Sequence, residues 1–512
     1  MLTRIPAGLV SLLLFATSLP ANAAASPPFT ADFAKFPAGW TTHGGDWKAD
    51  GKELRVEGGS GPKALLDGRE FGDFQLTVEV RLDSPDTQAG VLFRVKGASE
   101  GIDAFHGYYA GIHAGANRVI WGAGEPGWRA IASQSEAVVA GRWYRLKLEV
   151  AGDNARIYFN ETPVAEGAWP VFDGIDKAYA KGAIGLRALG GAASFRGLTV
   201  DRLEKPALPA SYTNPVRPGG ADPVVLRHGG MYYAYCTYTP DFPTMPRGIR
   251  LYTSPNLVDW KDEGFVLKNQ DSWGDSRFWA PDIVEKDGTF YLYYAADERM
   301  CVATAGSPLG PFRQQKEEPM LPESIRIDGH VFEDDDGQRY FYYVTFGEGN
   351  EIWGGKLNDD MTSVDPASLE RMVKPDQPWE RHKWAVTEGP EMLKHDGTYY
   401  LTYSGSHFES PEYAMGYATS DSPLGPWKKY EFNPVMKSTA YAHGTAHHCF
   451  TESPDGKEMF IFYHRHHTLD ETEPRALSID RVRYVPDPKG GPDILQIHGP
   501  TSSPQPMPSG AE

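Results

Sequence analysis

Apolar and polar residues alternate with a period of two through the first two fifths of the chain, from about residue 28 to residue 203. Residues 74–82 (FQLTVEVRL) and 145–150 (RLKLEV) are the clearest examples. Strict alternation is typical of strands with one buried and one wet face, as in antiparallel sandwiches. We therefore predict an all-β sandwich over residues 28–203.

A different pattern, a repeated hairpin, fills the rest of the chain. Each copy has a polar residue at the mouth of a strand, a short apolar run, a glycine-containing turn and an aromatic strand, as in residues 387–403 (TEGPEMLKHDGTYYLTY). The copies begin 60, 46, 60 and 59 residues apart, at Asp222, Asp282, Asp328, Glu388 and His447. This spacing suits one four-stranded blade per repeat. Radial repetition of such sheets predicts a five-bladed β-propeller over residues 212–498.

The inner strands of a propeller surround one axis, so equivalent positions on them converge. We expect Asp222, Asp282, Asp328, Glu388 and His447 to share that position and to form one ionisable cluster. For Asp282 alone, a simple turn-capping role stays open. Strand alternation predicts that Glu391 points to the opposite face from Glu388 and is structural or peripheral.

The composition limits the partners of the protein. The chain has 512 residues and a formal net charge of −18, which argues against nucleic acid and anionic membrane surfaces as partners. Arg4, the apolar run 9–16 and the small residues 21–23 (ANA) predict a signal peptide over residues 1–23 and a periplasmic or secreted mature protein without a membrane anchor. The alternative is an uncleaved anchor, although the run is short for a membrane span.

The remaining segments are short. Two prolines and no apolar periodicity predict a stiff linker over residues 204–211. Residues 499–512 are expected to form a disordered tail. The odd number and wide spacing of Cys236, Cys301 and Cys449 favour buried thiols over a disulfide scaffold, with one disulfide still open.

The first domain resembles the concanavalin-like, laminin-G-like jelly rolls, chiefly in residues 74–80, 89–94 and 143–150. Domains of this kind often accompany carbohydrate enzymes as binding modules. Four aromatic residues could stack on sugar rings: Tyr108, Tyr109, Trp121 and Trp128. The alternatives are that they are core aromatics, or that the domain is a structural cover for the propeller.

The second domain resembles glycoside hydrolase family 43, the five-bladed propeller glycosidases. Four motifs carry the resemblance, in this order: Ala221-Asp222-Pro223, Trp279-Ala280-Pro281-Asp282, Ile327-Asp328-Gly329-His330 and Glu388-Gly389-Pro390. The resemblance implies that Asp222 is the general base, that Glu388 is the general acid, and that Asp328 tunes and orients the acid.

The resemblance also implies residues around the substrate. His447 matches a central histidine that contacts a structural calcium ion in several members, and Arg475 matches an arginine that reaches the substrate. Ala446 stands where glycine is common, which puts the calcium in doubt; no cofactor is expected to be required. The remaining expected substrate-binding residues are His330 and, as an apolar wall, Phe278 and Trp279. Residues 464–467 (HRHH) have a metal-like composition, but strand alternation would split them between two faces.

These residues suit glycosidic bond cleavage, which needs one carboxyl to protonate the leaving oxygen and another to act across the ring. The leading hypothesis is an exported, inverting exo-glycosidase with a carbohydrate substrate, of the α-L-arabinofuranosidase or β-D-xylosidase type. One alternative is a galactosidase or galactofuranosidase of the same family, and another is a non-catalytic carbohydrate-binding propeller. A retaining, invertase-like enzyme would carry an Arg-Asp-Pro motif, which the sequence lacks.

Overall fold

The computed structural model describes residues 28–511, except 125–126, 153, 169–178, 204–209, 239–246, 317 and 322–324. The predicted signal peptide and most of the predicted linker lie outside the described residues. The described part of the chain contains strands and four short 3-10 turns: η1 (Phe33–Lys35), η2 (Asn269–Asp271), η3 (Pro366–Ser368) and η4 (Pro378–Arg381). In that part, no helix has the length and apolar character needed to cross a membrane.

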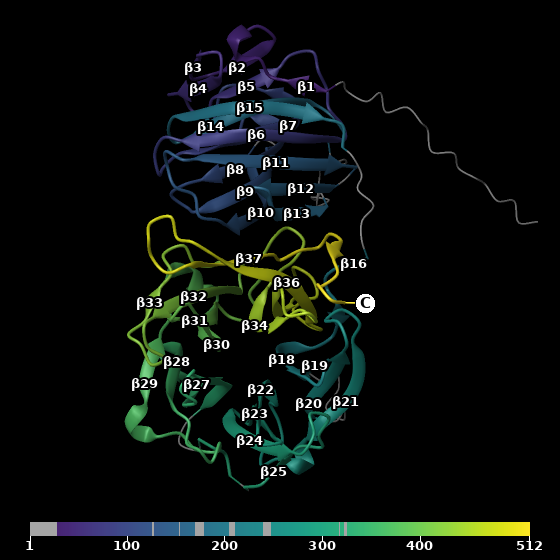
Figure 1. The fold of residues 1–512 in the computed structure, drawn as a ribbon, viewed down its shortest axis with the longest axis vertical. Helices are drawn as coiled ribbons and strands as arrows, with labels where there is room; N and C mark the ends of the chain where they lie inside the picture. Colours follow the sequence, from purple (N-terminus) through teal and green to yellow (C-terminus); the bar gives the residue numbers. More distant parts are fainter. Residues whose placement is uncertain are drawn as a thin grey trace, which may run out of the picture.

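The first domain is a sandwich of two antiparallel sheets (Figure 1). The first sheet has the spatial order β13 (Thr162–Ala168), β12 (Asn154–Phe159), β11 (Trp143–Ala151), β6 (Phe74–Leu82), β15 (Ala193–Asp201), β4 (Glu53–Glu57) and β3 (Asp46–Ala49), with β1 (Phe29–Thr30) beside β15. The second has the order β10 (Trp128–Ser135), β9 (Arg118–Gly124), β8 (Phe105–His113), β7 (Gln88–Ala98), β14 (Ala183–Leu189), β5 (Lys63–Leu66) and β2 (Trp40–His43). The prediction of an all-β sandwich is confirmed.

The alternating pattern places the core of the sandwich between the two sheets. Every second residue of β6 is buried, and these side chains share one apolar cluster with the inward residues of β7 and β8. Tyr108 and Trp121 belong to that cluster, and Tyr109 is fully buried against Leu92 in a second one. These three aromatic side chains are therefore part of the interior and are not available to stack on a sugar. Trp128 is partly buried and packs edge-on against Tyr109.

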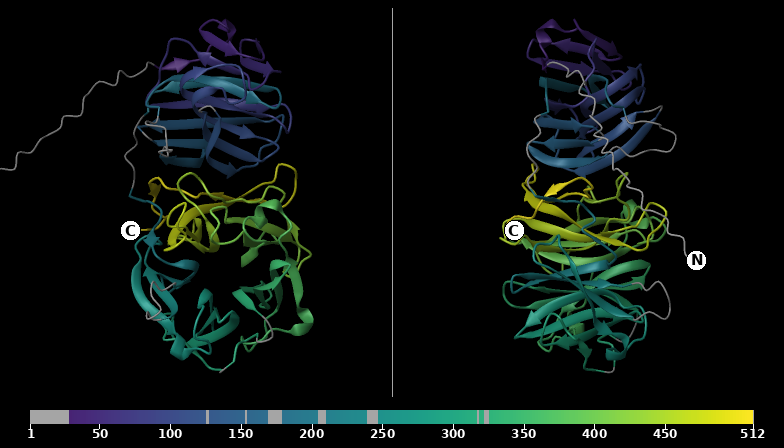
Figure 2. Two further views of the ribbon diagram at one scale, coloured as in Figure 1. Left: turned by 180° about the vertical axis from the view of Figure 1, so that it is seen from behind. Right: turned by 90° about the vertical axis from the view of Figure 1, so that its right-hand side faces the viewer.

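The second domain is a five-bladed propeller (Figures 1 and 2). The first four blades, written from the inner strand outward, are β18 (Ala221–His228), β19 (Met231–Thr237), β20 (Gly248–Ser254) and β21 (Lys261–Lys268); β22 (Trp279–Lys286), β23 (Thr289–Ala296), β24 (Arg299–Ala305) and β25 (Arg313–Gln314); β26 (Arg326–Glu333), β27 (Arg339–Gly347), β28 (Gly349–Lys356) and β29 (Glu370–Val373); β30 (Thr387–His395), β31 (Thr398–Gly405), β32 (Ala414–Ser420) and β33 (Lys428–Lys429). Each blade corresponds to one predicted repeat, which confirms the predicted fold.

The fifth blade closes the ring with strands from both ends of the domain. It contains β34 (Ala446–Glu452), β35 (Met459–Arg465), β36 (Ala476–Val485), β37 (Ile494–His498) and, paired with β36, β17 (Arg217–Pro218) from the domain's start. The three cysteines lie on blade strands as free, buried thiols, as predicted.

The expectation of a disordered tail over residues 499–512 is wrong for residues 499–511. There, β38 (Gln505–Pro506) pairs with β16 (Ser211–Tyr212). The Thr501 hydroxyl also donates to the buried Asp480 Oδ1 at 2.6 Å. These partners, which are remote in sequence, hold the segment in place.

All five inner strands carry a bulge near their start, where the pairing with the second strand slips by one residue. At each bulge one residue has a positive φ: Asp222, Ala280, Asp328, Gly389 or His447. A left-handed backbone costs a non-glycine residue free energy, and such residues cluster at functional sites. The bulge is therefore the local structure that sets the direction of the polar side chains at the axis.

The sandwich rests on the side of the propeller formed by the fifth blade (Figures 1 and 2). The backbone of Ala440 donates to the carbonyl of Ile131 at 3.0 Å, and the Gln496 amide donates to Glu136 Oε2 at 2.8 Å. Glu136 is buried at this contact, which raises the pKa of its carboxyl to about 7.

Candidate active site

The bulges bring polar side chains of four blades together at one end of the axis. Asp222, Asp328, Glu388 and His447 all lie within the first three residues of their inner strands, and all but the partly buried His447 are buried. We call these four residues the mouth ring. Three of the five residues expected at an equivalent position, Asp222, Asp328 and His447, do share it, at the positive-φ residue of the bulge. Glu388 comes one residue before the equivalent Gly389, and Asp282 comes two residues after the equivalent Ala280.

Asp222 is surrounded by nitrogen atoms. Arg475 Nη1 donates to its Oδ1 at 2.8 Å, and His447 Nδ1 lies 3.4 Å from the same oxygen. The backbone N–H of Asp222 donates to His464 Nδ1 at 3.2 Å. Burial alone would raise the pKa of this carboxyl, but the Arg475 guanidinium, with the two imidazoles, holds it well below the usual aspartate range. Asp222 is therefore ionised at neutral pH.

Glu388 has the opposite electrostatic environment. Its carboxyl is buried and accepts only neutral hydrogen bonds, from the Tyr413 hydroxyl at 2.9 Å and the Asn350 amide at 2.8 Å. Burial, aided by the negative charge of Asp222, raises its pKa above the ordinary glutamate value, although both hydrogen bonds act in the other direction. Glu388 can therefore hold a proton at a pH where Asp222 cannot.

Asp328 is coupled to Glu388. Its Oδ2 accepts the backbone N–H of Gly389, the residue after Glu388, at 3.1 Å. Burial, followed by repulsion from Glu388 and Asp222, raises its pKa well above the usual range. Two interacting carboxyls titrate as a pair, so the Asp328–Glu388 pair retains a proton that isolated carboxyls would release.

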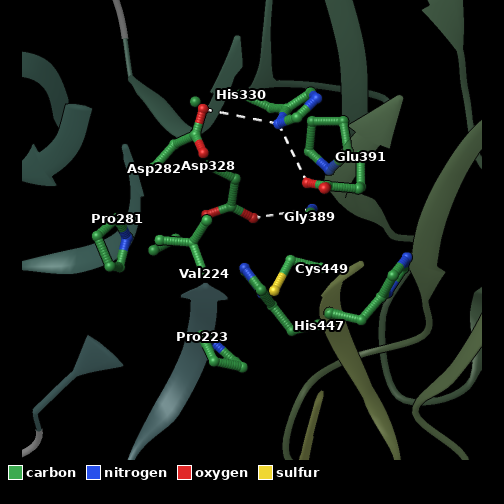
Figure 3. Close-up of a pocket in the computed structure, with 14 residues that line it drawn as sticks. Pro223, Val224, Pro281, Asp282, Asp328, His330, Gly389, Glu391, His447 and Cys449 are labelled. Atoms are coloured by element: carbon green, nitrogen blue, oxygen red, sulfur yellow. Dashed lines mark hydrogen bonds and ion pairs between the residues drawn. The ribbon is translucent and has the colours of Figure 1, made fainter. Parts of the chain in front are cut away.

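A second set of polar residues lies further along the inner strands, and we call it the inner ring: Asp282, His330 and Glu391 (Figure 3). His330 Nδ1 lies 3.1 Å from Glu391 Oε2 and 3.6 Å from Asp282 Oδ2, and its Nε2 accepts the Met392 N–H at 3.1 Å. A cavity of about 20 Å³, with room for one water molecule, lies between this set and residues of the mouth ring.

The prediction that Glu391 points away from Glu388 is wrong. Glu388 pairs with Ser404 and Glu391 pairs with Thr402, two residues apart on the straight partner strand. Directly paired residues share a face, so the bulge directs both glutamates to the same side of the sheet. Plain alternation fails there because the strand contains one extra residue.

Three side chains that support the mouth ring were missed by the sequence analysis: Asn350, Tyr413 and His464. Asn350 is the second residue of β28 and Tyr413 immediately precedes β32, so both lie where a third blade strand begins. Arg475 lies at the matching place before β36. Comparing third-strand starts across the repeats would have found them. His464 lies at the second-strand end, paired with Ala446, where the sequence suggested only a split metal-like cluster.

The aromatic residues expected near the substrate are distributed differently. Phe278 is buried in the apolar cluster of the first two blades and stacks on Tyr294 at 6.0 Å. Trp279 is partly buried, with the Arg277 guanidinium 5.9 Å from its ring. Two further tryptophans, Trp273 and Trp384, are exposed.

The side chains around His447 do not form an oxygen-rich cage for calcium. Calcium prefers six to eight oxygen ligands. The carboxylate nearest to the His447 ring, that of Asp222, is already paired with Arg475, and the other close neighbour is the imidazole of His464, with ring centres 6.0 Å apart. The donor set therefore gives no support for direct calcium ligation at His447.

The mouth ring thus combines a carboxylate kept ionised, a carboxyl kept protonated and a coupled third carboxyl. When the environments of two titratable groups move their pKa values apart, one can accept a proton while the other donates one. General acid–base catalysis requires such a pair of groups.

Comparisons with known proteins agree with the geometry. Residues 212–489 match the model of glycosyl hydrolases family 43, and residues 30–201 match a 3-keto-alpha-glucoside-1,2-lyase-like domain. The propeller region is 29% identical to a beta-D-galactofuranosidase of Aspergillus niger over 53% of this chain and 82% of that protein. It is 27% identical to an extracellular exo-alpha-(1->5)-L-arabinofuranosidase of Streptomyces avermitilis, over 51% of this chain and 57% of that protein.

Solved structures show the same fold. A crystal structure of a thermostable family-43 glycoside hydrolase is 36% identical, with a TM-score of 0.53, over 59% of this chain and all of that chain. A structure named as an endo-1,4-beta-xylanase of Bacteroides thetaiotaomicron is also 36% identical, with a TM-score of 0.52, over 58% of this chain and 99% of that chain. Because the family model covers more than half of the chain, including all five inner strands of the propeller, the protein belongs to glycoside hydrolase family 43 and is a glycosidase.

Proposed function

We propose that the propeller removes terminal furanosyl or pentosyl residues from a polysaccharide or oligosaccharide, with inversion at the anomeric carbon. In this proposal Glu388 is the general acid, Asp222 is the general base, and Asp328 orients and tunes Glu388. The opposite pKa shifts of Asp222 and Glu388 within one buried ring carry the proposal.

The reaction follows from these two protonation states. Glu388 gives its proton to the glycosidic oxygen as the bond to the anomeric carbon breaks. Asp222 takes a proton from a water molecule on the opposite face of the sugar, and the water oxygen bonds to the anomeric carbon. Such a water requires a carboxyl separation of about 6.5–9.5 Å, and attack from that face inverts the configuration. Arg475 keeps Asp222 in the ionised form that can accept the proton.

The class of sugar is inferred from the names of the relatives. They include arabinofuranosidases, a xylosidase/arabinosidase of Bacteroides ovatus, and the galactofuranosidase of Aspergillus niger. α-L-Arabinofuranose and β-D-galactofuranose share their ring configuration and differ by one exocyclic CH₂OH group. Arabinofuranosidase or xylosidase activity is our first candidate, because several of these relatives carry such names. Galactofuranosidase activity is the second, favoured by the Aspergillus niger relative.

Export is part of the proposal. The signal-like residues 1–23 motivate it, and two of the relatives are named as extracellular enzymes. Polysaccharides are extracellular substrates, so an exported enzyme would meet them. Secretion would be checked by the N-terminal sequence of the mature protein.

A panel of nitrophenyl glycosides tests the activity: α-L-arabinofuranoside, β-D-xyloside and β-D-galactofuranoside. We expect hydrolysis of at least one, and proton NMR should show the inverted anomer as the first product. A first product that retains the configuration would contradict the roles of Asp222 and water. No hydrolysis of any of the three would contradict the sugar class.

A further inference from the structure

Exposed apolar side chains gather at the end of the propeller that carries the mouth ring. First and third blade strands begin at this end, so the loops from second to third strands, and from each blade to the next, lie there. Among the residues that the structure describes, six large apolar side chains are exposed: Ile102, Trp273, Leu309, Phe346, Trp384 and Leu469. Four of them are in these loops or beside them: Trp273, Phe346, Trp384 and Leu469. Single exposed apolar residues are common, but a group around one site indicates a binding surface.

Phe346 is placed beside Glu388 by the register of the third blade. It pairs directly with Asn350 across the β27–β28 hairpin, and directly paired side chains lie on the same face, about 5 Å apart. The Asn350 side chain donates to Glu388 Oε2. The ring of Phe346, 45% exposed, therefore lies on the face that carries the hydrogen bond to Glu388.

The backbone next to Trp384 lies on the other side of Asn350 from Phe346. The Asn350 N–H donates to the carbonyl of Ala385, the next residue after Trp384, at 3.0 Å. The loop is also tied to the fourth blade, because the His382 N–H donates to Ser406 Oγ and Lys383 pairs with Glu409. Lys383 has a φ of +62°, a strained conformation held by these contacts. These contacts hold the backbone on both sides of Trp384, whose side chain is 59% exposed.

We propose that Phe346 and Trp384 form the binding site for the leaving-group sugar, the residue that remains on the glycan after cleavage. The inference rests on the proposed role of Glu388. A general acid protonates the glycosidic oxygen, so the sugar attached to that oxygen must lie on the side of the acid. Phe346 and the backbone beside Trp384 both adjoin Asn350, which donates a hydrogen bond to Glu388. The apolar face of a sugar ring packs well on an exposed aromatic ring.

The proposal predicts that the two aromatic residues matter only when the leaving group is a sugar. Trp384→Ala and Phe346→Ala are compared with wild type on two substrates that carry the same terminal sugar. One is an oligosaccharide, and the other is the glycosyl fluoride, whose leaving fluoride ion cannot stack on an aromatic ring. We expect kcat/KM for the oligosaccharide to fall by about tenfold to a hundredfold in each variant. The value for the fluoride should stay unchanged.

Two controls sharpen the comparison. Leu309→Ala removes an equally exposed apolar side chain at the opposite end of the propeller and should affect neither substrate. Trp384→Phe keeps an aromatic ring and should restore most of the oligosaccharide activity. Equal losses on both substrates, or full oligosaccharide activity in both alanine variants, would overturn the leaving-group site. If wild type hydrolyses neither substrate, the proposed function itself fails.

Discussion

Asp222 and Glu388 differ in the charge of their immediate neighbours. Both carboxyls are buried, which on its own would keep both protonated. Arg475 overcomes that effect at Asp222, whereas Glu388 accepts hydrogen bonds from two neutral groups, Tyr413 and Asn350. A positive charge beside Asp222, and neutral hydrogen-bond partners at Glu388, therefore let one carboxyl stay ionised at a pH where the other holds a proton.

Tyr413→Phe tests the control of the acid. The Tyr413 hydroxyl stabilises the ionised form of Glu388, so its removal raises the pKa of that carboxyl. The alkaline limb of the kcat/KM profile, which reports loss of the Glu388 proton, should move to higher pH by up to about one unit. Tyr403→Phe, which removes a buried hydroxyl bonded to Glu380 instead, should leave the limb in place. A shift of the limb to lower pH in Tyr413→Phe would contradict the assignment of Glu388.

The bulge is the feature at the level of the strand that turns a repeated hairpin into an active site. It recurs at the start of every inner strand and shifts the side-chain alternation that follows. Without it, Glu388 and Glu391 would face opposite sides of β30. With it, Glu391 faces the axis and shares the inner ring with Asp282 and His330 (Figure 3).

Gly389→Ala tests the bulge of the fourth blade. Gly389 has a φ of +55°, and a Cβ there would lie 3.3 Å from the His447 ring. We expect a loss of about 1–2 kcal/mol in the free energy of unfolding and a fall in kcat/KM on the order of tenfold to a hundredfold, because His447 must move. Gly397→Ala is the matched control. Its φ is +79° but nothing lies within 4 Å of the added Cβ, so stability should fall while activity persists. Full activity in Gly389→Ala would show that the bulge does not position the site.

Much of the fold was predictable because the two patterns that reveal it, apolar–polar alternation and a repeated hairpin, are local in the sequence. Alternation in residues such as 74–82 revealed the sandwich strands, and the repeated hairpins revealed the blades. The direction of Glu391 was not predictable, because a one-residue bulge leaves no mark in an apolar–polar pattern. Asn350 and Tyr413 were missed because their role depends on a neighbour 38 and 25 residues away in the sequence. The order of residues 499–511 likewise depends on pairing with β16.

At the scale of the whole molecule, the sandwich packs against the fifth blade, which closes the propeller ring. The loop that follows the fourth blade and leads to His447 also contacts the sandwich, through Ala440 and Ile131. Glu136 lies at the same interface with a pKa raised to about 7 by burial, so folding places a carboxyl where its ionised form is disfavoured. The contact between the domains should therefore depend on pH.

Glu136→Gln tests this dependence. The folded pKa of about 7 exceeds the ordinary glutamate value of 4.5, so the folded state binds the proton more tightly. Stability linked to Glu136 is fully present below pH 4.5 and is lost as the pH rises toward and through 7, by up to ~3 kcal/mol. The melting temperature of wild type, relative to the variant, should fall over this range. Glu161→Gln, at an exposed carboxyl of the same domain, should parallel wild type. Parallel curves for wild type and Glu136→Gln would contradict the prediction.

The central claim is that Glu388 acts as the acid and Asp222 as the base. The dependence of kcat/KM on the leaving group tests this claim most directly. The kcat/KM values of wild type, Glu388→Gln and Asp222→Asn are compared on a phenyl glycoside and a dinitrophenyl glycoside of the same sugar. A dinitrophenolate leaves without protonation, whereas an unactivated phenol requires the acid.

We predict that Glu388→Gln loses on the order of 10²–10⁴-fold on the phenyl glycoside and far less on the dinitrophenyl glycoside. Asp222→Asn should lose activity on both to a similar extent, because both reactions need the activated water. Equal losses on the two substrates in Glu388→Gln, or retained activity on either substrate in Asp222→Asn, would contradict the assignment of acid and base.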